Sequence, residues 1–278
     1  LHFSDMHCGH AKDDQEWKTV EDEIVDDLKR NVLKEIHGGK NVDLVLFTGD
    51  LTNTGVPSEF AELSRRIKQI TTGTGITQNR LLAIPGNHDL EWPDDKTRDK
   101  LLEAWPHSEQ AANPKIVWDE GNLNKINGYF SSYLEWWNRS RQALSTVSNN
   151  NLVIHENSGP GMPGDFSATV QKNGAKIGII GLNSSFLQNN KGIKEGELGI
   201  SFSQINALLG EQTLGQFCDS HSATLLLTHH PMSWLTENAI KEFKLKIADP
   251  KYFALHLFGH VHQPNLFFIE DNDGRQCH

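Results

Sequence analysis

The sequence predicts a layered α/β or α+β domain, and two observations support this fold class. Short β-rich apolar runs alternate along the chain with longer stretches in which apolar residues recur every three or four positions. The composition agrees, because 37% hydrophobic and 22% charged residues is an ordinary globular balance for a chain of 278 residues. Disordered and fibrous classes are therefore excluded.

The N-terminal part is predicted to alternate short strands with two helices. Leu1–Phe3, Asp43–Thr48 and Arg80–Ile84 are the β-rich runs. A long amphipathic helix follows the first run, and Gly38-Gly39 is expected to end it. A second helix lies between the other two runs, with an apolar stripe formed by Phe60, Leu63, Ile67 and Ile70.

The alternation resumes after residue 165. A hairpin is predicted from Phe166–Val170 and Lys176–Leu182, joined through an Asn173-Gly174 turn. Further on, two helices each lead to a strand, and the expected order is Ser203–Leu214, Ala223–Thr228, Glu237–Ile247 and Ala254–Phe258. A last strand is predicted at Asn265–Glu270, and the sequence ends soon after the turn that follows it. Together with a start that lacks Met, this indicates a piece of a longer chain.

Residues 90–165 interrupt the alternation with a segment rich in aromatic side chains, including five tryptophans. We interpret its aromatic stretch Tyr129–Trp137 as the core of a small helical cap, in preference to a platform on which nucleic-acid bases stack. Because the segment lies between two of the clusters described below, it is expected to cover the functional site and to set substrate choice.

Charge and cysteine content narrow the function classes. The chain has 26 basic and 36 acidic residues, and its first sixty residues hold 13 acidic and 6 basic side chains. No basic face is visible, so tight binding of nucleic acid is possible but not favoured. Three cysteines make a disulfide framework unexpected, which favours a reducing, cytoplasmic location. No apolar run approaches the ~18 residues of a membrane span, so no membrane partner is expected.

Five clusters of metal-type ligands each follow directly after a predicted strand. They are Phe3-Ser4-Asp5-Met6-His7, Phe47-Thr48-Gly49-Asp50, Pro85-Gly86-Asn87-His88-Asp89, Thr228-His229-His230-Pro231 and Phe258-Gly259-His260-Val261-His262. Strand ends at one edge of a sheet are where α/β proteins place their sites. Each cluster alone is explained equally well by a turn or a strand end, but five in this order are not expected by chance.

The ligands in these clusters are carboxylate, imidazole and amide groups. Such a mixed set suits Mn, Fe, Zn, Co or Ni better than Ca or Mg alone. Seven candidates are too many for one ion and fit two ions that share a bridging carboxylate, for which Asp50 is the central choice. We therefore expect two divalent metal ions, Mn²⁺ first among them, held by Asp5, His7, Asp50, Asn87, His229, His260 and His262.

The order Asp-x-His, Gly-Asp, Gly-Asn-His-Asp, His and Gly-His-x-His resembles the calcineurin-like metallophosphoesterase superfamily, and the match spans Asp5 to His262. The resemblance implies a four-layer α/β/β/α sandwich of two mixed sheets, as a single catalytic domain over residues 1–278 with residues 90–165 as a cap insertion. It also implies that Asp50 bridges two metals, the first held by Asp5, His7 and His262 and the second by Asn87, His229 and His260.

Three residues beside the ligands are considered for roles other than metal coordination, and two interpretations are open for both Asp89 and His230. His88 adjoins a ligand, imidazole is the usual proton donor at neutral pH, and the resemblance makes it a catalytic residue near the leaving group. Asp89 is predicted either to orient His88 or to cap a helix. His230 is interpreted either as a residue that supports a ligand or faces the substrate, or as a purely structural one.

The implied activity is hydrolysis of phosphate esters by a hydroxide that bridges the two metals, with His88 assisting the leaving group. Residues 90–165 lack a basic cluster that would grip the second negative charge of a monoester, so we expect small or nucleotide-like phosphodiesters to be favoured. A nuclease of the same superfamily is one alternative, which the acidic balance disfavours. A non-catalytic binding scaffold is the other, and it is disfavoured because no ligand position is missing.

Overall fold

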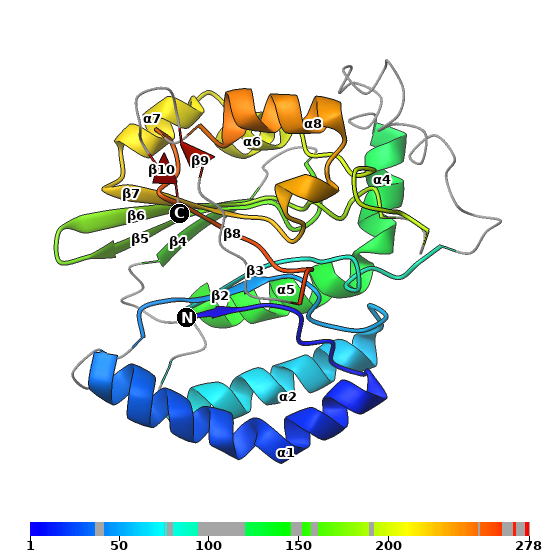
Figure 1. The fold of residues 1–278 in the computed structure, drawn as a ribbon, viewed down its shortest axis with the longest axis vertical. Coiled ribbons are helices and arrows are strands. Elements are labelled where there is room, and N and C mark those ends of the chain that lie inside the picture. Colours follow the sequence, from blue (N-terminus) through cyan, green and yellow to red (C-terminus); the bar gives the residue numbers. More distant parts are fainter. Residues whose placement is uncertain are drawn as a thin grey trace.

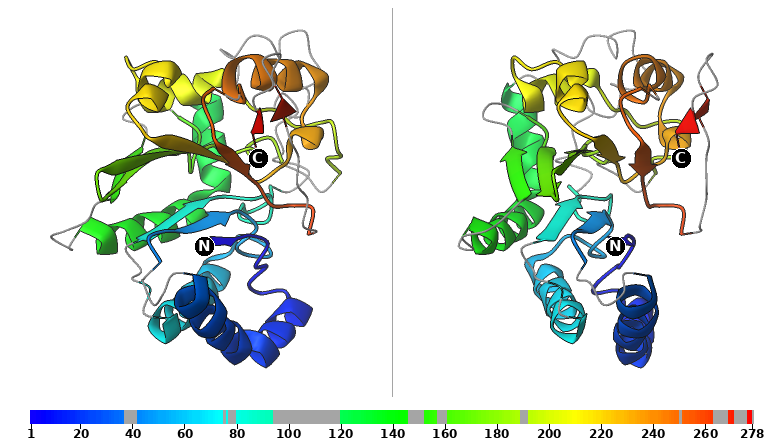
Figure 2. Two further views of the ribbon diagram at one scale, coloured as in Figure 1. Left: turned by 60° about the vertical axis from the view of Figure 1, so that its left-hand side comes forward. Right: turned by 90° about the vertical axis from the view of Figure 1, so that its left-hand side faces the viewer.

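Two packed sheets enclosed by helices form the core of the protein in the computed structural model (Figure 1). Helices lie on the outer side of each sheet, so the order of layers is helix, sheet, sheet, helix in all three views (Figures 1 and 2). The predicted layered α/β sandwich is therefore confirmed. The structure describes residues 1–36, 42–74, 76, 80–93, 120–145, 152–156, 161–188, 192–249, 251–262, 269–270 and 276–277.

The first sheet is built from the N-terminal strands β1 (His2–Phe3), β2 (Val45–Thr48) and β3 (Leu81–Ile84), all parallel. Helix α1 (Ala11–Asp27), which continues as η1 (Leu28–Ile36), connects β1 to β2, and α2 (Pro57–Thr74) connects β2 to β3. Each helical crossover returns the chain to the same end of the sheet, so the strands that it connects run parallel. The described part of this sheet is therefore wholly parallel, whereas a mixed sheet was expected.

The second sheet contains five strands in the order in which they occur along the chain. Its first three strands are antiparallel, and its last three run parallel. The strands are β4 (Leu152–Glu156), β5 (Phe166–Lys172), β6 (Ala175–Gly181), β7 (Ala223–Leu227) and β8 (Leu255–Leu257). The predicted hairpin is confirmed as β5–β6, where Asn173 and Gly174 turn the chain with φ angles of 51° and 84°.

Helices α6 (Phe202–Leu209), α7 (Leu214–Asp219) and α8 (Glu237–Glu242) cover the outer face of the second sheet (Figure 1). The single helix predicted at 203–214 is in fact two, because Gly210 ends α6 at a φ of 61° and Thr213 caps α7 with its hydroxyl. The remaining elements are η5 (Met232–Trp234), η6 (Phe243–Ile247), β9 (Ile269–Glu270) and β10 (Gln276–Cys277). No helix in the described ranges is long and apolar enough to cross a membrane.

The inner faces of the two sheets share one hydrophobic cluster. Phe47 and Ile84 from the first sheet are buried together with Phe166, Ile179 and Leu227 from the second. Side chains of this size remove most of the apolar surface between the sheets from water, which fixes the sheets against one another. This packing also fixes the position of the carboxyl ends of the parallel strands in one sheet relative to those in the other.

The described part of the segment 90–165 belongs to the sandwich itself. Tyr133, on α5 (Ser131–Ser145), donates a hydrogen bond of 2.9 Å to the carbonyl of Ala83 in β3, and Trp136 stacks on Phe60 of α2. β4 pairs with β5 along its full length, and α4 (Glu120–Tyr129) leads directly into α5. Residues 94–119 of the predicted cap lie outside the described residues.

Candidate metal centre

The five ligand clusters meet at the carboxyl ends of β1, β2, β3, β7 and β8. Each cluster begins within three residues of the end of its strand, as the sequence predicted. The loops after β1 and β8 are tied together, because the backbone N–H of His260 donates to the carboxylate of Asp5 at 3.0 Å. Residues 255 positions apart in the sequence thus line one site across the two sheets.

The backbone at this site is held in an uncommon conformation. Positive φ angles occur at Asp5 (56°), His7 (41°), Asp50 (51°), His260 (72°) and His262 (50°). L-residues in this region cost of order 1–3 kcal/mol each and persist only where the surrounding structure determines them. Among the described non-glycine residues, Asn173 is the one further example. The strain is therefore concentrated at the predicted ligands.

Two glycines of the motifs are required by close approach. A Cβ atom on Gly86 would overlap the backbone and carboxylate of Asp50. A Cβ atom on Gly259 would overlap the side chain of Ser4 and would lie 2.8 Å from Oδ2 of Asp5. Each contact is tighter than a real Cβ atom tolerates, so these glycines allow the ligand loops to pack against one another.

A first group of donor atoms comes from Asp5, His7, Asp50 and His262, and all four atoms lie within 4.8 Å of one another. The Nε2 atoms of His7 and His262 are 3.1 Å apart, and Nε2 of His262 is 3.5 Å from Oδ1 of Asp5. Nε2 of His7 lies 4.0 Å from Oδ2 of Asp50. The side chain of His262 is 59% exposed, so this group lies at the mouth of the site.

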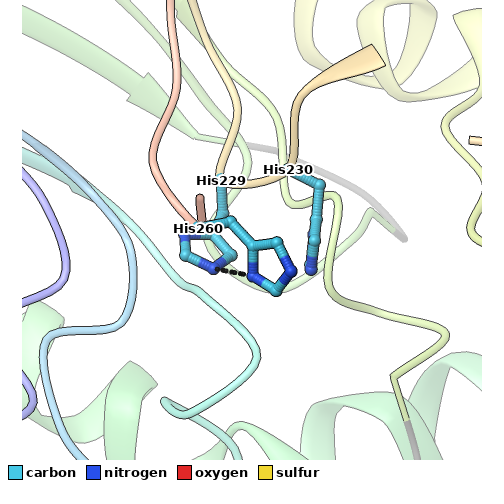
Figure 3. Close-up of side chains that lie close together, drawn as sticks. All are labelled: His229, His230 and His260. Carbon is cyan, nitrogen blue, oxygen red and sulfur yellow. Dashed lines mark hydrogen bonds between the residues drawn. The ribbon is translucent and has the colours of Figure 1, made fainter. Parts of the chain in front are cut away.

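A second, deeper group is formed by Asn87, His229 and His260. Oδ1 of Asn87 is 2.9 Å from both Nε2 of His229 and Nδ1 of His260. These two nitrogens are 3.2 Å apart, as the dashed line in Figure 3 marks. His229 is fully buried, and its Nδ1 donates to the carbonyl of Thr48 at 2.7 Å. That bond orients the ring so that Nε2 faces the other two donors.

Asp50 lies between the two groups and is almost completely buried. Its Oδ2 is the atom nearest His7, whereas its Oδ1 is 3.3 Å from Nε2 of His229. Oδ1 also accepts a hydrogen bond of 2.8 Å from the backbone N–H of His88, which fixes the plane of the carboxylate. The carboxylate of Asp50 thus places one oxygen near the donor atoms of each group.

The donor atoms fit divalent metal ions. Two ligands bound to one ion at about 2.1 Å lie roughly 3.0–3.4 Å apart at tetrahedral or octahedral angles. The nitrogen–nitrogen separations of 3.1 and 3.2 Å match this, and two imidazole nitrogens at such a distance require a proton or a cation between them. The nitrogen and oxygen donor set suits transition metals such as Mn, Fe and Zn.

The charges of the site also favour a cation. Burial opposes ionisation of Asp50, but the charge and hydrogen bond of His229 outweigh it and hold the pKa of this carboxyl well below its usual range. Burial likewise lowers the pKa of His229, and Asp50 more than offsets this, raising that pKa to about 9. Burial and the positive His229 then lower the pKa of His260 to about 3. A proton on His229 here balances the charge that metal ions would balance.

His88 lies beside the first group. Its ring is perpendicular to that of His7, with centroids 4.8 Å apart, and Trp92 lies 6.3 Å away on another side. Nδ1 of His88 donates to the carbonyl of Asn53 at 2.7 Å, since a carbonyl can only accept. This bond fixes the ring and leaves Nε2 as the atom available for chemistry.

Asp89 has a different role from the two that were predicted, which is a correction. Its buried carboxylate accepts from the backbone N–H groups of Leu51, Thr52 and Gly86 at 2.8–3.2 Å, and from the hydroxyl of Thr52. Among the described hydrogen bonds, Asp89 neither caps a helix nor pairs with the imidazole of His88, whose Nδ1 donates to the carbonyl of Asn53. Asp89 instead joins the loop after β2 to the loop after β3. Burial and the charge of Asp50 raise its pKa to about 6.

Replacing Asp89 is therefore expected to affect folding. Asp89→Ala leaves three buried N–H groups without an acceptor, and we expect a loss of about 3–5 kcal/mol in the free energy of unfolding. Asp89→Asn keeps one acceptor oxygen and should lose less. Urea denaturation of the metal-free proteins measures both. A loss below about 1 kcal/mol for Asp89→Ala would contradict this role.

Two residues at the site, Asn53 and Ser184, do not belong to the metal-type ligands from which the site was predicted. Asn53 acts through its backbone carbonyl, which any residue could supply. Ser184 hydrogen-bonds His230 and lies just beyond the end of β6. Its position after a strand resembles that of the ligand clusters, but it contributes no metal-type ligand, and only that strand-end position could have indicated it.

Comparison with known families agrees with this geometry. The family model for calcineurin-like phosphoesterases matches residues 1–264. The chain therefore belongs to the calcineurin-like phosphoesterase family, whose members are metal-dependent hydrolases of phosphoesters with dinuclear sites. No curated relative matches the chain.

Proposed function

We propose that this chain hydrolyses phosphodiesters with small, nucleotide-like substituents, using two divalent ions of which Mn²⁺ is preferred. The observation that best supports a two-ion reaction is the position of the Asp50 carboxylate, whose two oxygens lie near separate ligand groups. When bound, such a pair of ions polarises the phosphoryl group and lowers the pKa of the attacking water. The seven ligands of the two groups hold the ions, and the chain's other residues position the ester.

His88 is proposed to protonate the leaving group. Its Nδ1–H is engaged by the Asn53 carbonyl, so the imidazolium form can donate from Nε2. In the reaction, a hydroxide formed from water by loss of a proton to solvent bonds through its oxygen to phosphorus, the ester P–O bond breaks, and the departing oxygen takes the proton from His88. Because the ring lies against His7, the leaving group is placed on the side of the first, more exposed group.

The preference for diesters is supported by the charges and side chains around the site. No lysine or arginine in the described part of the chain pairs with Asp5 or Asp50. A monoester would bring a second negative charge, and no basic side chain of the described residues pairs with the carboxylates at this site. Trp92 lies beside His88, and the ring of Trp234 lies 4.0 Å from that of His260. These two partly exposed tryptophans offer apolar surface to the organic parts of a diester.

A substrate panel tests this proposal. The purified, Mn²⁺-loaded chain is assayed with p-nitrophenyl phosphate, its bis-ester, cyclic nucleotides, and single-stranded and duplex DNA. We expect kcat/KM for the bis-ester to equal or exceed that for the monoester, and duplex DNA to stay uncleaved at physiological salt. A monoester rate tenfold above the diester rate would overturn the diester preference. Efficient cleavage of DNA would support a nuclease, and no turnover of any ester would support a binding scaffold.

A further inference from the structure

His230 has a buried ring nitrogen that the proposed mechanism does not use. Its side chain is only 2% exposed, and its ring lies beside the second ligand group, with centroids 4.7 Å from His229 and 4.4 Å from His260 (Figure 3). A nitrogen of His230 lies within 4.8 Å of donor nitrogens of both neighbours. Within the described residues, Nε2 of His230 is buried without a hydrogen-bond partner.

The hydrogen bonds around Nδ1, the other ring nitrogen of His230, indicate which nitrogen carries the ring proton. The backbone N–H of His230 donates to Oγ of Ser184 at 2.9 Å, and the same Oγ lies 3.1 Å from Nδ1 of the ring. Ser184 is buried, so its own hydroxyl hydrogen needs an acceptor. Among the described residues, Nδ1 of His230 is the acceptor within reach. The hydroxyl therefore donates to Nδ1, and the neutral ring carries its proton on Nε2.

The ring is also fixed in place. Trp234 packs against both His230 and His260, with ring centroids 5.6 and 4.0 Å away. Within the described residues, no carboxylate hydrogen-bonds the ring. A buried N–H donor without an acceptor is costly, so a partner such as a water, an ion or a bound ligand is expected to complete the bond.

We propose that Nε2–H of His230 donates a hydrogen bond to a non-bridging phosphoryl oxygen of the substrate, and that Ser184 positions this proton. This inference rests on the proposed function and adds a substrate-binding residue to it. Coordination of the second ion by Nε2 is the competing arrangement. It would move the ring proton to Nδ1 and leave the buried hydroxyl of Ser184 without an acceptor, so the hydrogen bonds favour the donor.

The first experiment measures inorganic phosphate binding and metal content in the Mn²⁺-loaded protein. His230→Ala should keep the wild-type metal content and weaken phosphate binding roughly 10- to 100-fold, as expected for one hydrogen bond to a charged group. His230→Gln should recover part of the affinity, because its amide N–H can replace Nε2–H. His155→Ala, which removes an exposed imidazole on β4, is the matched control and should bind phosphate as the wild type does.

The second experiment reads the tautomer directly, by nitrogen NMR of histidine-labelled, metal-free protein. We expect His230 to be protonated on Nε2 in the wild type and to populate both tautomers in Ser184→Ala. This measurement needs neither metal nor activity, and it remains decisive if His230→Ala fails to fold. A proton on Nδ1 in the wild type would overturn the assignment.

The outcomes separate this inference from the proposed function. Loss of one metal ion in His230→Ala would show that His230 is a ligand, and unchanged phosphate affinity would show that it is structural. Either result overturns the inference while ester hydrolysis by the wild type still stands. A wild-type chain that loads metal but neither hydrolyses esters nor binds phosphate would overturn both.

Discussion

Asp50→Asn is expected to lower kcat/KM for phosphate esters by about 10³-fold or more, which corresponds to about 4 kcal/mol of transition-state stabilisation. The two carboxylate oxygens of Asp50 approach donor nitrogens of separate ligand groups, one near His229 and the other near His7. Asparagine retains one oxygen that can bind a metal ion, but it lacks the negative charge and the second metal-binding oxygen. The amide can still accept the hydrogen bond from the backbone of His88, so the fold should persist.

The matched control for this change is Asp22→Asn, which removes the same charge from an exposed position on α1. Its kcat/KM should stay within twofold of the wild type, and circular dichroism should show native folding in both variants. If Asp50→Asn keeps its activity within tenfold of the control, Asp50 does not bridge the two groups.

His88→Ala is expected to lower kcat by roughly 10²–10⁴-fold, the usual range for loss of general acid–base catalysis. Metal content and folding should be unchanged, because the ring contacts the Asn53 carbonyl and neighbouring rings and no metal ligand depends on it. The loss should be smallest for esters of p-nitrophenol, whose anion departs without a proton. Steady-state kinetics over a series of leaving groups measures this difference.

His155→Ala again controls for removal of an imidazole, in this case far along the chain on the edge strand β4. An equal loss for good and poor leaving groups would contradict proton donation by His88 and would assign it to stabilising charge on the phosphoryl group. Loss of a metal ion in His88→Ala would instead make it a ligand.

The convergence of the candidate ligands could be predicted from the sequence, because each of them follows a strand that can be recognised locally. Each ligand lies within a few residues of a strand end, and the ends of parallel strands converge once the topology is known. His260 and His262 flank one residue, and both adopt the left-handed conformation that turns their rings toward the same site. Residue type and order were therefore enough to bring together groups as distant as Asp5 and His262.

Contacts that depend on two loops folding against each other were not predictable in this way. The partners of Asp89 lie up to 38 residues away and are backbone groups, which leave no trace in side-chain pattern. The aromatic residues Tyr133 and Trp136 were predicted to form the core of a helical cap, but they pack on the sandwich, because periodicity does not say against which layer a helix packs. The pairing of Ser184 with His230 likewise arises only when β6 and β7 lie side by side.

Metal content per folded chain, measured by elemental analysis after saturation with Mn²⁺ and removal of free metal, tests the central claim most directly. A site in which Asp50 links two ligand groups should hold about two ions per wild-type chain. Changing a ligand of one group, as in His7→Ala or His229→Ala, should leave about one, and Asp50→Asn should weaken both ions. A wild-type content that saturates at one ion and is unchanged in Asp50→Asn would contradict the two-ion centre.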